Sequence, residues 1–290
     1  MTRLAVLLTC LIGLQTFRSA ADAVSISASV KNGNAAVADL NPEDFRLVDN
    51  GVRQDVEVLT VESVPIDLTL FVDTSGSTAG ALSRMRADVE RMVRLLGPAD
   101  RFRILTIGII VDETVPWTPE GGSFALTVRP VPGISLIYDA LFAALLHRPD
   151  AGRRHLVVGL TDGDDCGSVI DGPSLLDASA RTEAVLHILY AQAYSRGDFG
   201  LPATCTPLDP SSSDFIRKAA ERTGGAFHKS LFGDASVHDF QRIVDEFKTS
   251  YVLRYSPRGV ARAGWHAITV DVPGRPGVTV HARAGYFVDR

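Results

Sequence analysis

Apolar and polar residues alternate one by one near the start of the chain, which is the period of a strand with one buried face. From Val24 to Val30, each apolar residue is followed by a serine. Asn and Gly turn signals follow at 31–34 and 50–51, because both residues tolerate positive φ. Further short strands are expected at Phe45 to Val48, Val56 to Val61, Tyr251 to Tyr255, Trp265 to Val272 and Val278 to Ala282.

Residues 64–249 show a different rhythm, in which apolar runs of strand length alternate with apolar residues at helical spacing. The predicted strands are Ile66 to Val72, Phe102 to Val111, His155 to Leu160, Val185 to Tyr190 and Ala226 to His228. The predicted helices are Leu82 to Leu96, Leu136 to Leu146, Phe215 to Arg222 and Val237 to Phe247. Strands that alternate with helices predict an α/β fold with a doubly wound, mostly parallel sheet.

The two outer segments, 24–62 and 250–290, are each small for a stable sheet. We expect them to pair with one another across the central residues 64–249 and to form one discontinuous β-sandwich. The alternative is that each segment extends a separate sheet. Backbone pairing between the two segments distinguishes these arrangements.

Composition limits the classes of function. Of the 290 residues, 46% are hydrophobic and 22% are charged, which is typical of a globular protein with a sizeable core. The 29 Lys and Arg residues against 34 Asp and Glu residues give a net charge of −5. This balance argues against general nucleic-acid binding, which requires a basic surface to neutralise phosphates.

Residues 1–23 have the features of a secretory signal peptide. A short basic start with Arg3 precedes an apolar run from Leu4 to Leu14, and Ala21-Asp22-Ala23 has the small-x-small pattern of a cleavage site. An uncleaved anchor is the alternative. No later stretch is long and apolar enough to cross a bilayer, so we expect a secreted or periplasmic protein without a membrane span in the mature chain.

The three cysteines lie at positions 10, 166 and 205. Export would remove Cys10 with the leader and bring the other two into an oxidising compartment, where a remaining pair is usually bridged. Cys166 follows one predicted strand and Cys205 lies in the loop after the next, so both loops are expected at the same edge of the sheet. The sequence therefore predicts a Cys166–Cys205 disulfide.

Oxygen-bearing side chains gather where the predicted parallel strands end. The first strand of the central part runs into Asp73-Thr74-Ser75-Gly76-Ser77, a D-x-S-x-S pattern. Asp162 follows a later strand, and Ser135 lies in the loop before a predicted helix. Ligands bind at this edge in open α/β sheets. Carboxylates and hydroxyls are hard donors that suit Mg²⁺, Mn²⁺ or Ca²⁺ better than zinc.

These residues resemble the metal-ion-dependent adhesion site (MIDAS) of the von Willebrand factor type A (VWA) domain. That site combines D-x-S-x-S with a downstream Thr and with an Asp at a later strand end. Asp73, Ser75, Ser77 and Asp162 match this pattern, whereas Ser135 stands where the family has Thr. Ser135 keeps the hydroxyl but lacks the methyl group that restricts its rotamer.

The mature chain as a whole is also similar to exported bacterial proteins built on this domain. The stretches that carry the similarity are Glu43 to Gly51, Ile137 to Ala140, Tyr251 to Tyr255 and Arg283 to Tyr286. The resemblance implies a VWA domain over 64–249 and a binding module rather than an enzyme. It also implies that the five site residues hold Mg²⁺ (or Mn²⁺ or Ca²⁺) and that an Asp or Glu carboxylate of a protein partner completes the coordination.

Other interpretations of the same residues stay open. Asp73 and Ser75 could cap the following helix, since Asp and Ser are favoured there. The fold could then be a metal-free structural or scaffold component of the cell envelope. Asp164 and Asp165 are expected at a solvated loop edge, and Asp139 is expected to have a structural role.

Motifs of common enzyme classes are missing. Ser75 stands where phosphohydrolases with an aspartate nucleophile place a second Asp. The sequence contains no G-x-S-x-G, H-E-x-x-H, G-x-G-x-x-G or Walker pattern. A metal-dependent hydrolase is therefore only the third candidate, behind the binding module and the scaffold component.

Overall fold

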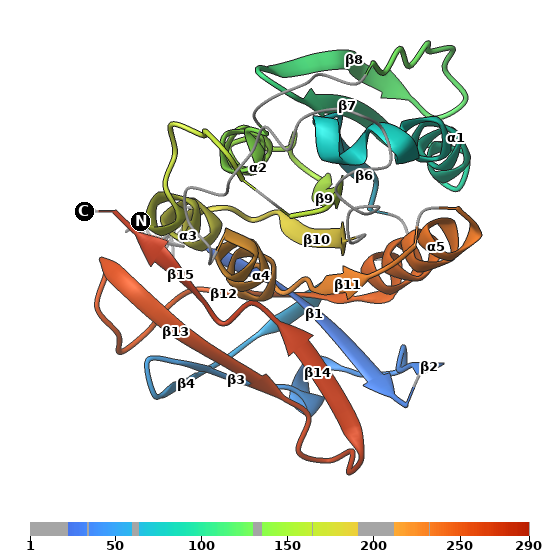
Figure 1. Ribbon diagram of the computed structural model, residues 1–290. Helices are drawn as coiled ribbons and strands as arrows, with labels where there is room; N and C mark the ends of the chain where they lie inside the picture. The colour runs from blue at the N-terminus through green and yellow to red at the C-terminus, as the bar shows by residue number, and fades with distance from the viewer. Residues whose placement is uncertain are drawn as a thin grey trace, which may run out of the picture.

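The computed structural model describes residues 23–33, 35–59, 64–129, 135–163, 165–190, 212–231 and 233–289. An α/β unit occupies the upper half of the molecule in Figure 1, and two smaller sheets lie beneath it. None of the helices in the described ranges combines the length and the apolar character needed to cross a membrane. The predicted signal peptide spans residues 1–23. Residues 1–22 lie outside the described ranges, which begin at Ala23.

The sheet of the α/β unit has six strands in the order β11-β10-β9-β6-β7-β8. Its strands are β6 (Ile66–Asp73), β7 (Arg101–Ile107), β8 (Val111–Pro119), β9 (Arg154–Thr161), β10 (Val185–Tyr190) and β11 (Phe227–Lys229). Neighbouring strands are parallel except for β7 and β8, which are antiparallel. The sheet is thus mostly parallel, with an antiparallel edge strand.

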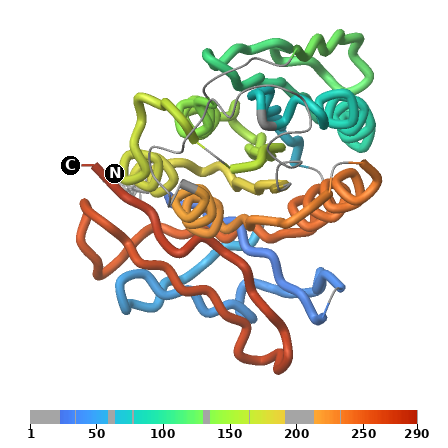
Figure 2. Tube along the Cα trace, in the orientation of Figure 1, coloured from blue at the N-terminus to red at the C-terminus, as the bar shows by residue number. Residues whose placement is uncertain are grey.

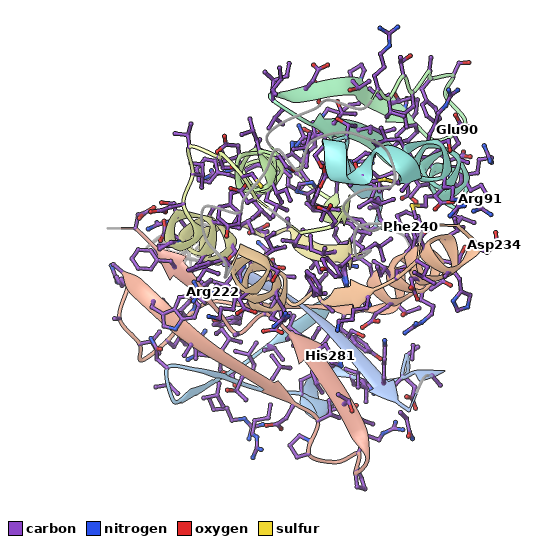
Figure 3. All side chains as sticks on the ribbon, in the orientation of Figure 1. Glu90, Arg91, Arg222, Asp234, Phe240 and His281 are labelled. Atoms are coloured by element: carbon purple, nitrogen blue, oxygen red, sulfur yellow. The ribbon has the colours of Figure 1, made fainter. Side chains whose placement is uncertain are left out.

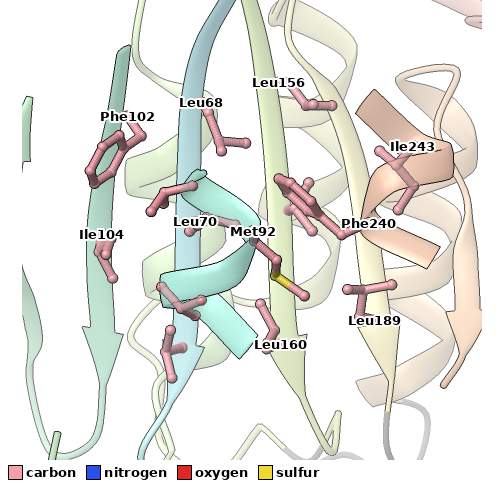
Figure 4. Packing of buried hydrophobic residues seen from close by; sticks show 14 of the residues in the cluster. Leu68, Leu70, Met92, Phe102, Ile104, Leu156, Leu160, Leu189, Phe240 and Ile243 are labelled. Atoms are coloured by element: carbon pink, nitrogen blue, oxygen red, sulfur yellow. The ribbon is translucent and has the colours of Figure 1, made fainter. Parts of the chain in front are cut away.

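Helices cover both faces of this sheet, which explains why its central strands β6 and β9 are buried almost throughout. The helices are α1 (Leu82–Val93), α2 (Ile137–Leu145), α3 (Gly172–Arg181), α4 (Ser212–Arg222) and α5 (Asp234–Thr249). Residues of α1 and α5 pack on one face, and residues of α2, α3 and α4 pack on the other. In Figure 4, Met92 of α1 and Phe240 of α5 lie over Leu160 and Leu189 of the sheet.

A buried carboxylate connects α1 to α5. Asp88 accepts hydrogen bonds from the Gly233 N–H and from the Ser236 hydroxyl, each at 2.6 Å. Arg91, one turn further along α1, pairs with both Asp88 and Asp234 (Figure 3). Asp88 therefore satisfies backbone and side-chain donors at the first turn of a neighbouring helix and fixes where α5 begins.

The strands at the two ends of the chain form a β-sandwich. One sheet has the order β14-β1-β12-β5, with β2 beside β1, and the other has the order β15-β13-β3-β4. The N-terminal strands are β1 (Val24–Asn32), β2 (Ala35–Ala36), β3 (Arg46–Asp49), β4 (Val52–Gln54) and β5 (Glu57–Leu59), with a 3₁₀ turn η2 (Pro42–Asp44). The C-terminal strands are β12 (Tyr251–Tyr255), β13 (Gly264–Asp271), β14 (Val278–Ala282) and β15 (Gly285–Val288).

Both sheets of the sandwich combine strands from both outer segments. Ile26 lies opposite Leu253 in the antiparallel pairing of β1 with β12, and Leu47 lies opposite Val270 in that of β3 with β13. These side chains share one apolar core. The tube in Figure 2 shows the blue and red ends of the chain interleaved. The predicted pairing of the two segments is confirmed, and the alternative of separate extensions is wrong.

Two arginines, the partly buried Arg154 and the buried Arg283, join the sandwich to the α/β unit. Arg154 donates to the Phe247 carbonyl and the Ser250 hydroxyl, both at 2.7 Å, and to the Ser27 hydroxyl at 3.1 Å. Its guanidinium also lies 3.9 Å from the centroid of the Phe247 ring. Arg283 donates to the carbonyls of Ala180 and Thr182 at the end of α3. A cation is favourable at this end of a helix, where carbonyls are left unpaired.

Several elements differ from the sequence-based expectation. The strand expected to end at Val111 ends at Ile107, and Val111 begins the antiparallel strand β8. Helix α1 ends at Val93 rather than Leu96, because Leu95 and Leu96 form tighter i→i+3 hydrogen bonds before Gly97. The short strands β4 and β15 and helix α3 were not predicted, since their apolar patterns are brief.

The junction at Arg154 yields a stability prediction. We expect Arg154→Met to lower the free energy of unfolding by about 2–3 kcal/mol, because three acceptors lose a charged donor. Urea denaturation monitored by circular dichroism measures this change. Arg148→Met, at an exposed position, provides the matched control and should be near neutral. Equal stability of the two variants would contradict a clamping role for Arg154.

Two buried histidines predict how stability depends on pH. Burial lowers the pKa of His155 and of His187 to about 3 in each case, so both are neutral in the folded chain. Below pH 6.5, these two imidazoles bind protons in the unfolded state, whereas they stay neutral in the folded state. We therefore expect the free energy of unfolding to fall below pH 6.5, with a slope that approaches about 1.4 kcal/mol per pH unit for each histidine.

Urea titrations between pH 7.5 and 5.5 test this dependence. His155→Gln and His187→Gln should each reduce the slope, whatever their effect on stability at pH 7.5. His238→Gln, at an exposed position on α5, is the control and should leave the slope nearly unchanged. The same slope in all four proteins would show that the buried histidines do not govern acid sensitivity.

Candidate metal centre

Asp73 is the centre of the predicted site. It is the last residue of β6, and its side chain is fully buried, with 0% exposure. One carboxylate oxygen, Oδ1, accepts the Ser75 backbone N–H at 3.0 Å and the Ser135 hydroxyl at 3.4 Å. The other oxygen, Oδ2, accepts the Thr161 hydroxyl at 2.7 Å. Residues from two loops and from the end of β9 therefore converge on one carboxylate.

The loop that carries the D-x-S-x-S pattern is held by hydrogen bonds from its threonines. Thr74 donates both its N–H and its hydroxyl to the Ile107 carbonyl, each at 2.7 Å. The Thr78 hydroxyl bonds to the carbonyls of Asp73 at 2.8 Å and Ser75 at 3.0 Å. The 3₁₀ segment η3 (Gly76–Ala81) then leads into α1. The loop is thus fixed to the end of β7 and folds back on itself.

Ser135 reaches the site from the loop before α2. Its side chain is buried, and its carbonyl accepts the Cys166 N–H at 2.9 Å. This bond ties the loop before α2 to the loop after β9. Cys205 lies outside the described residues, so the predicted Cys166–Cys205 disulfide stays a prediction.

Asp162 is buried at the end of β9, directly after Thr161. The structure thus brings Ser75 and Ser135 into contact with Asp73, and it places Asp162 next to a residue that bonds the same carboxylate. The backbone of Ser77 belongs to η3, but its side chain is not among the groups that the structure describes.

Two acidic neighbours hold the loops around the site. Asp165 was expected at a solvated edge, but it is buried and accepts the Tyr138 N–H at 3.0 Å and the Ser168 hydroxyl at 2.6 Å. The Asp139 carboxylate accepts the N–H groups of residues 169 and 170, at 3.1 and 2.9 Å, in the structural role that the sequence suggested. Asp164 lies outside the described residues.

The electrostatics of the site follow from burial. Burial raises the pKa of Asp73, and hydrogen bonds from Ser75, Thr161 and Ser135 lower it in part. All of these donors are neutral, so a bound divalent cation would supply the compensating charge. The donor set consists of hard oxygens, which fits Mg²⁺, Mn²⁺ or Ca²⁺. No group of three or more His, Cys, Asp and Glu side chains suited to a metal occurs in the described ranges, so a metal here depends on hydroxyl ligands.

Sequence reasoning missed Thr161 as a residue of the site. Thr161 is fully buried, and its hydroxyl donates to Asp73 and accepts the Gly163 N–H at 2.9 Å. A hydroxyl residue between an apolar strand and Asp162 is the signal that could have revealed it. Because Thr161 ends a central strand, its side chain reaches the carboxylate that ends the neighbouring strand.

Comparisons with known proteins give fold similarity alone. No protein-family model and no curated protein matches the sequence. Similar solved structures include the conserved hypothetical protein BatB from Bacteroides thetaiotaomicron, with 15% identity over 63% of this chain and 99% of that one, at a TM-score of 0.45. A von Willebrand factor type A protein from Catenulispora acidiphila has 12% identity over 94% of this chain and 65% of that one, at 0.48.

A third similar structure is proximal thread matrix protein 1 from the mussel byssus, solved with a zinc-occupied MIDAS motif. It shares 16% identity over 68% of this chain and 49% of its own length, at a TM-score of 0.47. Of these three structures, one is described as a VWA protein and one as carrying a MIDAS motif. Similarities of this size assign neither a ligand nor an activity to the chain.

The contact of Thr161 with Asp73 can be tested directly. Thr161→Val keeps the shape of the side chain but leaves a buried carboxylate oxygen without its hydroxyl donor. We expect a loss of about 1–3 kcal/mol in the free energy of unfolding, measured by urea denaturation without metal. Thr279→Val, at an exposed position on β14, is the control. A neutral result for Thr161→Val would mean that this hydrogen bond does not support the site.

Proposed function

We propose that this chain is a divalent-metal-dependent module that binds a protein ligand at the carboxyl edge of its central sheet. The observation that carries the proposal is the convergence of the Ser75, Ser135 and Thr161 hydroxyls on the buried Asp73 carboxylate. A helix cap alone would need only one acceptor near the start of η3. Hydroxyls from two loops and one strand end around one carboxylate are better suited to a cation.

In this proposal, the metal residues are Asp73, Ser75, Ser77, Ser135 and Asp162. Hydroxyls and carboxylates hold the ion, and Thr161 orients Asp73 by bonding the oxygen that faces β9. The bound ion would offer an open position to an acidic side chain, since Mg²⁺ readily keeps exchangeable ligands. The protein partner would supply an Asp or Glu carboxylate at that position.

The chain is further proposed to be exported, with residues 1–23 as its leader and Cys166–Cys205 as its disulfide. These proposals rest on the sequence. The α/β unit would correspond to 64–249, and the β-sandwich of 24–62 and 250–290 would be its support. An enzymatic role is not part of this proposal.

A metal-free scaffold component is the second candidate. The hydrogen bonds at Asp73 favour it in one respect, since they satisfy the carboxylate without an ion. A metal-dependent hydrolase is a distant third. The two main candidates differ in whether a cation stabilises the folded chain and whether partner capture depends on it.

Thermal unfolding with and without metal tests the proposal. A ligand that binds only the folded state stabilises it, and metal at about 100 times its Kd contributes about 2.7 kcal/mol. We expect Mg²⁺, Mn²⁺ or Ca²⁺ to raise the Tm above its value in EDTA by roughly 5–10 °C. Asp73→Asn should abolish this rise while remaining folded, because the amide keeps the shape of the carboxylate.

Asp112→Asn is the matched control, since it removes a carboxylate at an exposed position of β8. It should retain the full response to metal. An unchanged Tm at millimolar concentrations of all three ions would favour the scaffold candidate. A rise that persists in Asp73→Asn would show that metal binds elsewhere.

A further inference from the structure

A pocket is lined by residues at the carboxyl ends of β10 and β11 and in the first turns of α4. Figure 1 shows these elements side by side in the α/β unit. It has a volume of about 440 Å³. The rings of Tyr190 and Phe227 line it, with their centroids 5.0 Å apart. None of the residues assigned to the metal site lines this pocket.

The pocket is basic, although the protein as a whole is acidic. Lys229 and Arg217 both line it. Arg217 pairs with Asp214 at 3.0 Å and lies 5.5 Å from the centroid of the Phe227 ring. Within the described part of the chain, Lys229 makes no ion pair. An exposed, uncompensated lysine beside a second cation attracts a carboxylate.

A buried hydroxyl in the pocket also lacks a partner among the described residues. Ser230 is only 8% exposed, and its Oγ makes no hydrogen bond with any residue that the structure describes, although its backbone N–H bonds to the Tyr190 carbonyl at 2.8 Å. Most buried polar atoms in proteins are satisfied, so an exception in a pocket indicates a group that a ligand can satisfy. A carboxylate oxygen accepts from such a hydroxyl.

The pocket adjoins the metal site through Gly163. This residue follows Asp162 directly, and its φ is +82°. A Cβ at Gly163 would lie 2.9 Å from the Tyr190 ring and 3.8 Å from Ser213, which also lines the pocket. Glycine is therefore required both for the backbone conformation and for the close approach of Tyr190. Gly163 therefore lies between the candidate metal site and the pocket.

We infer that this basic pocket binds an acidic segment of the protein partner, with a glutamate carboxylate on Lys229, Arg217 and Ser230 and its methylene stem against Tyr190 and Phe227. The inference deepens the proposed function, because it gives the partner a second acidic residue beside the one on the metal. The pocket makes its contact without an ion, so it can be tested in EDTA.

Fluorescence anisotropy with a labelled hexaglutamate peptide tests the inference on the full mature chain in EDTA and in Mg²⁺. We expect binding in EDTA, tighter binding in Mg²⁺, and none with hexaglutamine. Lys229→Glu should weaken binding in EDTA by about tenfold or more, since it places like charges together. Ser230→Ala should weaken it without lowering the Tm, because the hydroxyl has no internal partner.

Lys218→Glu is the matched control. Lys218 is exposed on α4, next to Arg217, and does not line the pocket. Its replacement by Glu changes the net charge by the same amount as Lys229→Glu does. If Lys218→Glu and Lys229→Glu weaken binding equally, the effect is general electrostatics and the inference is wrong. It is also wrong if hexaglutamate does not bind in EDTA.

Failure of this inference can be separated from failure of the proposed function. Binding that requires Mg²⁺, is lost in Asp73→Asn and is unaffected in Lys229→Glu would overturn the pocket and leave the metal module standing. Binding that depends on Lys229 and is unchanged by Mg²⁺ or by Asp73→Asn would establish the pocket and count against the metal module.

Discussion

The antiparallel pairing of β1 with β12 and β14 is the constraint on which the rest of the molecule depends. It brings the two ends of the chain into one sheet, and β5 pairs with the other side of β12. The chain leaves the sandwich after β5 to form the α/β unit and returns to it at β12. Because β5 and β12 are neighbouring strands, both connections lie side by side. Arg154 and Arg283 then fix the orientation of the α/β unit. Arg154 of β9 donates to the Ser27 hydroxyl on β1, and Arg283 of the sandwich donates to the carbonyls of Ala180 and Thr182 at the end of α3.

That edge concentrates polar groups whose burial is costly unless they are satisfied. Asp73 meets this requirement with neutral donors from its own loop and from the ends of two other elements. Under the proposed function, these donors would turn to a cation of suitable size. The same bonds connect the loop after β6, the loop before α2 and the end of β9, so a change at the carboxylate would be felt in all three.

Much of this arrangement can be predicted from the sequence. The strand before Asp73, β10 and β12 follow from uninterrupted or alternating apolar runs, and the order of Asp73, Ser135 and Asp162 along α/β elements predicts their convergence. The hairpin between β7 and β8 could not be predicted, because Gly108 to Ile110 continue the apolar run through the turn. Thr161 was missed as a site residue, and Asp165 was wrongly expected at a solvated edge, for a related reason. Their roles depend on which loop each faces, and this is set by the register between distant strands and not by local pattern.

The interleaved sandwich also has a consequence for the order of folding. Ile26 cannot find its partner Leu253 until nearly the whole chain has been synthesised. Contacts of such long sequence separation form late and slowly, since a large loop must close first. The α/β unit, whose strands pair with near neighbours, can form before them. Until the last strands arrive, the N-terminal strand has unpaired edges, and an incomplete chain would expose them to other chains. The sandwich can therefore close only after the strands up to β15 have been synthesised.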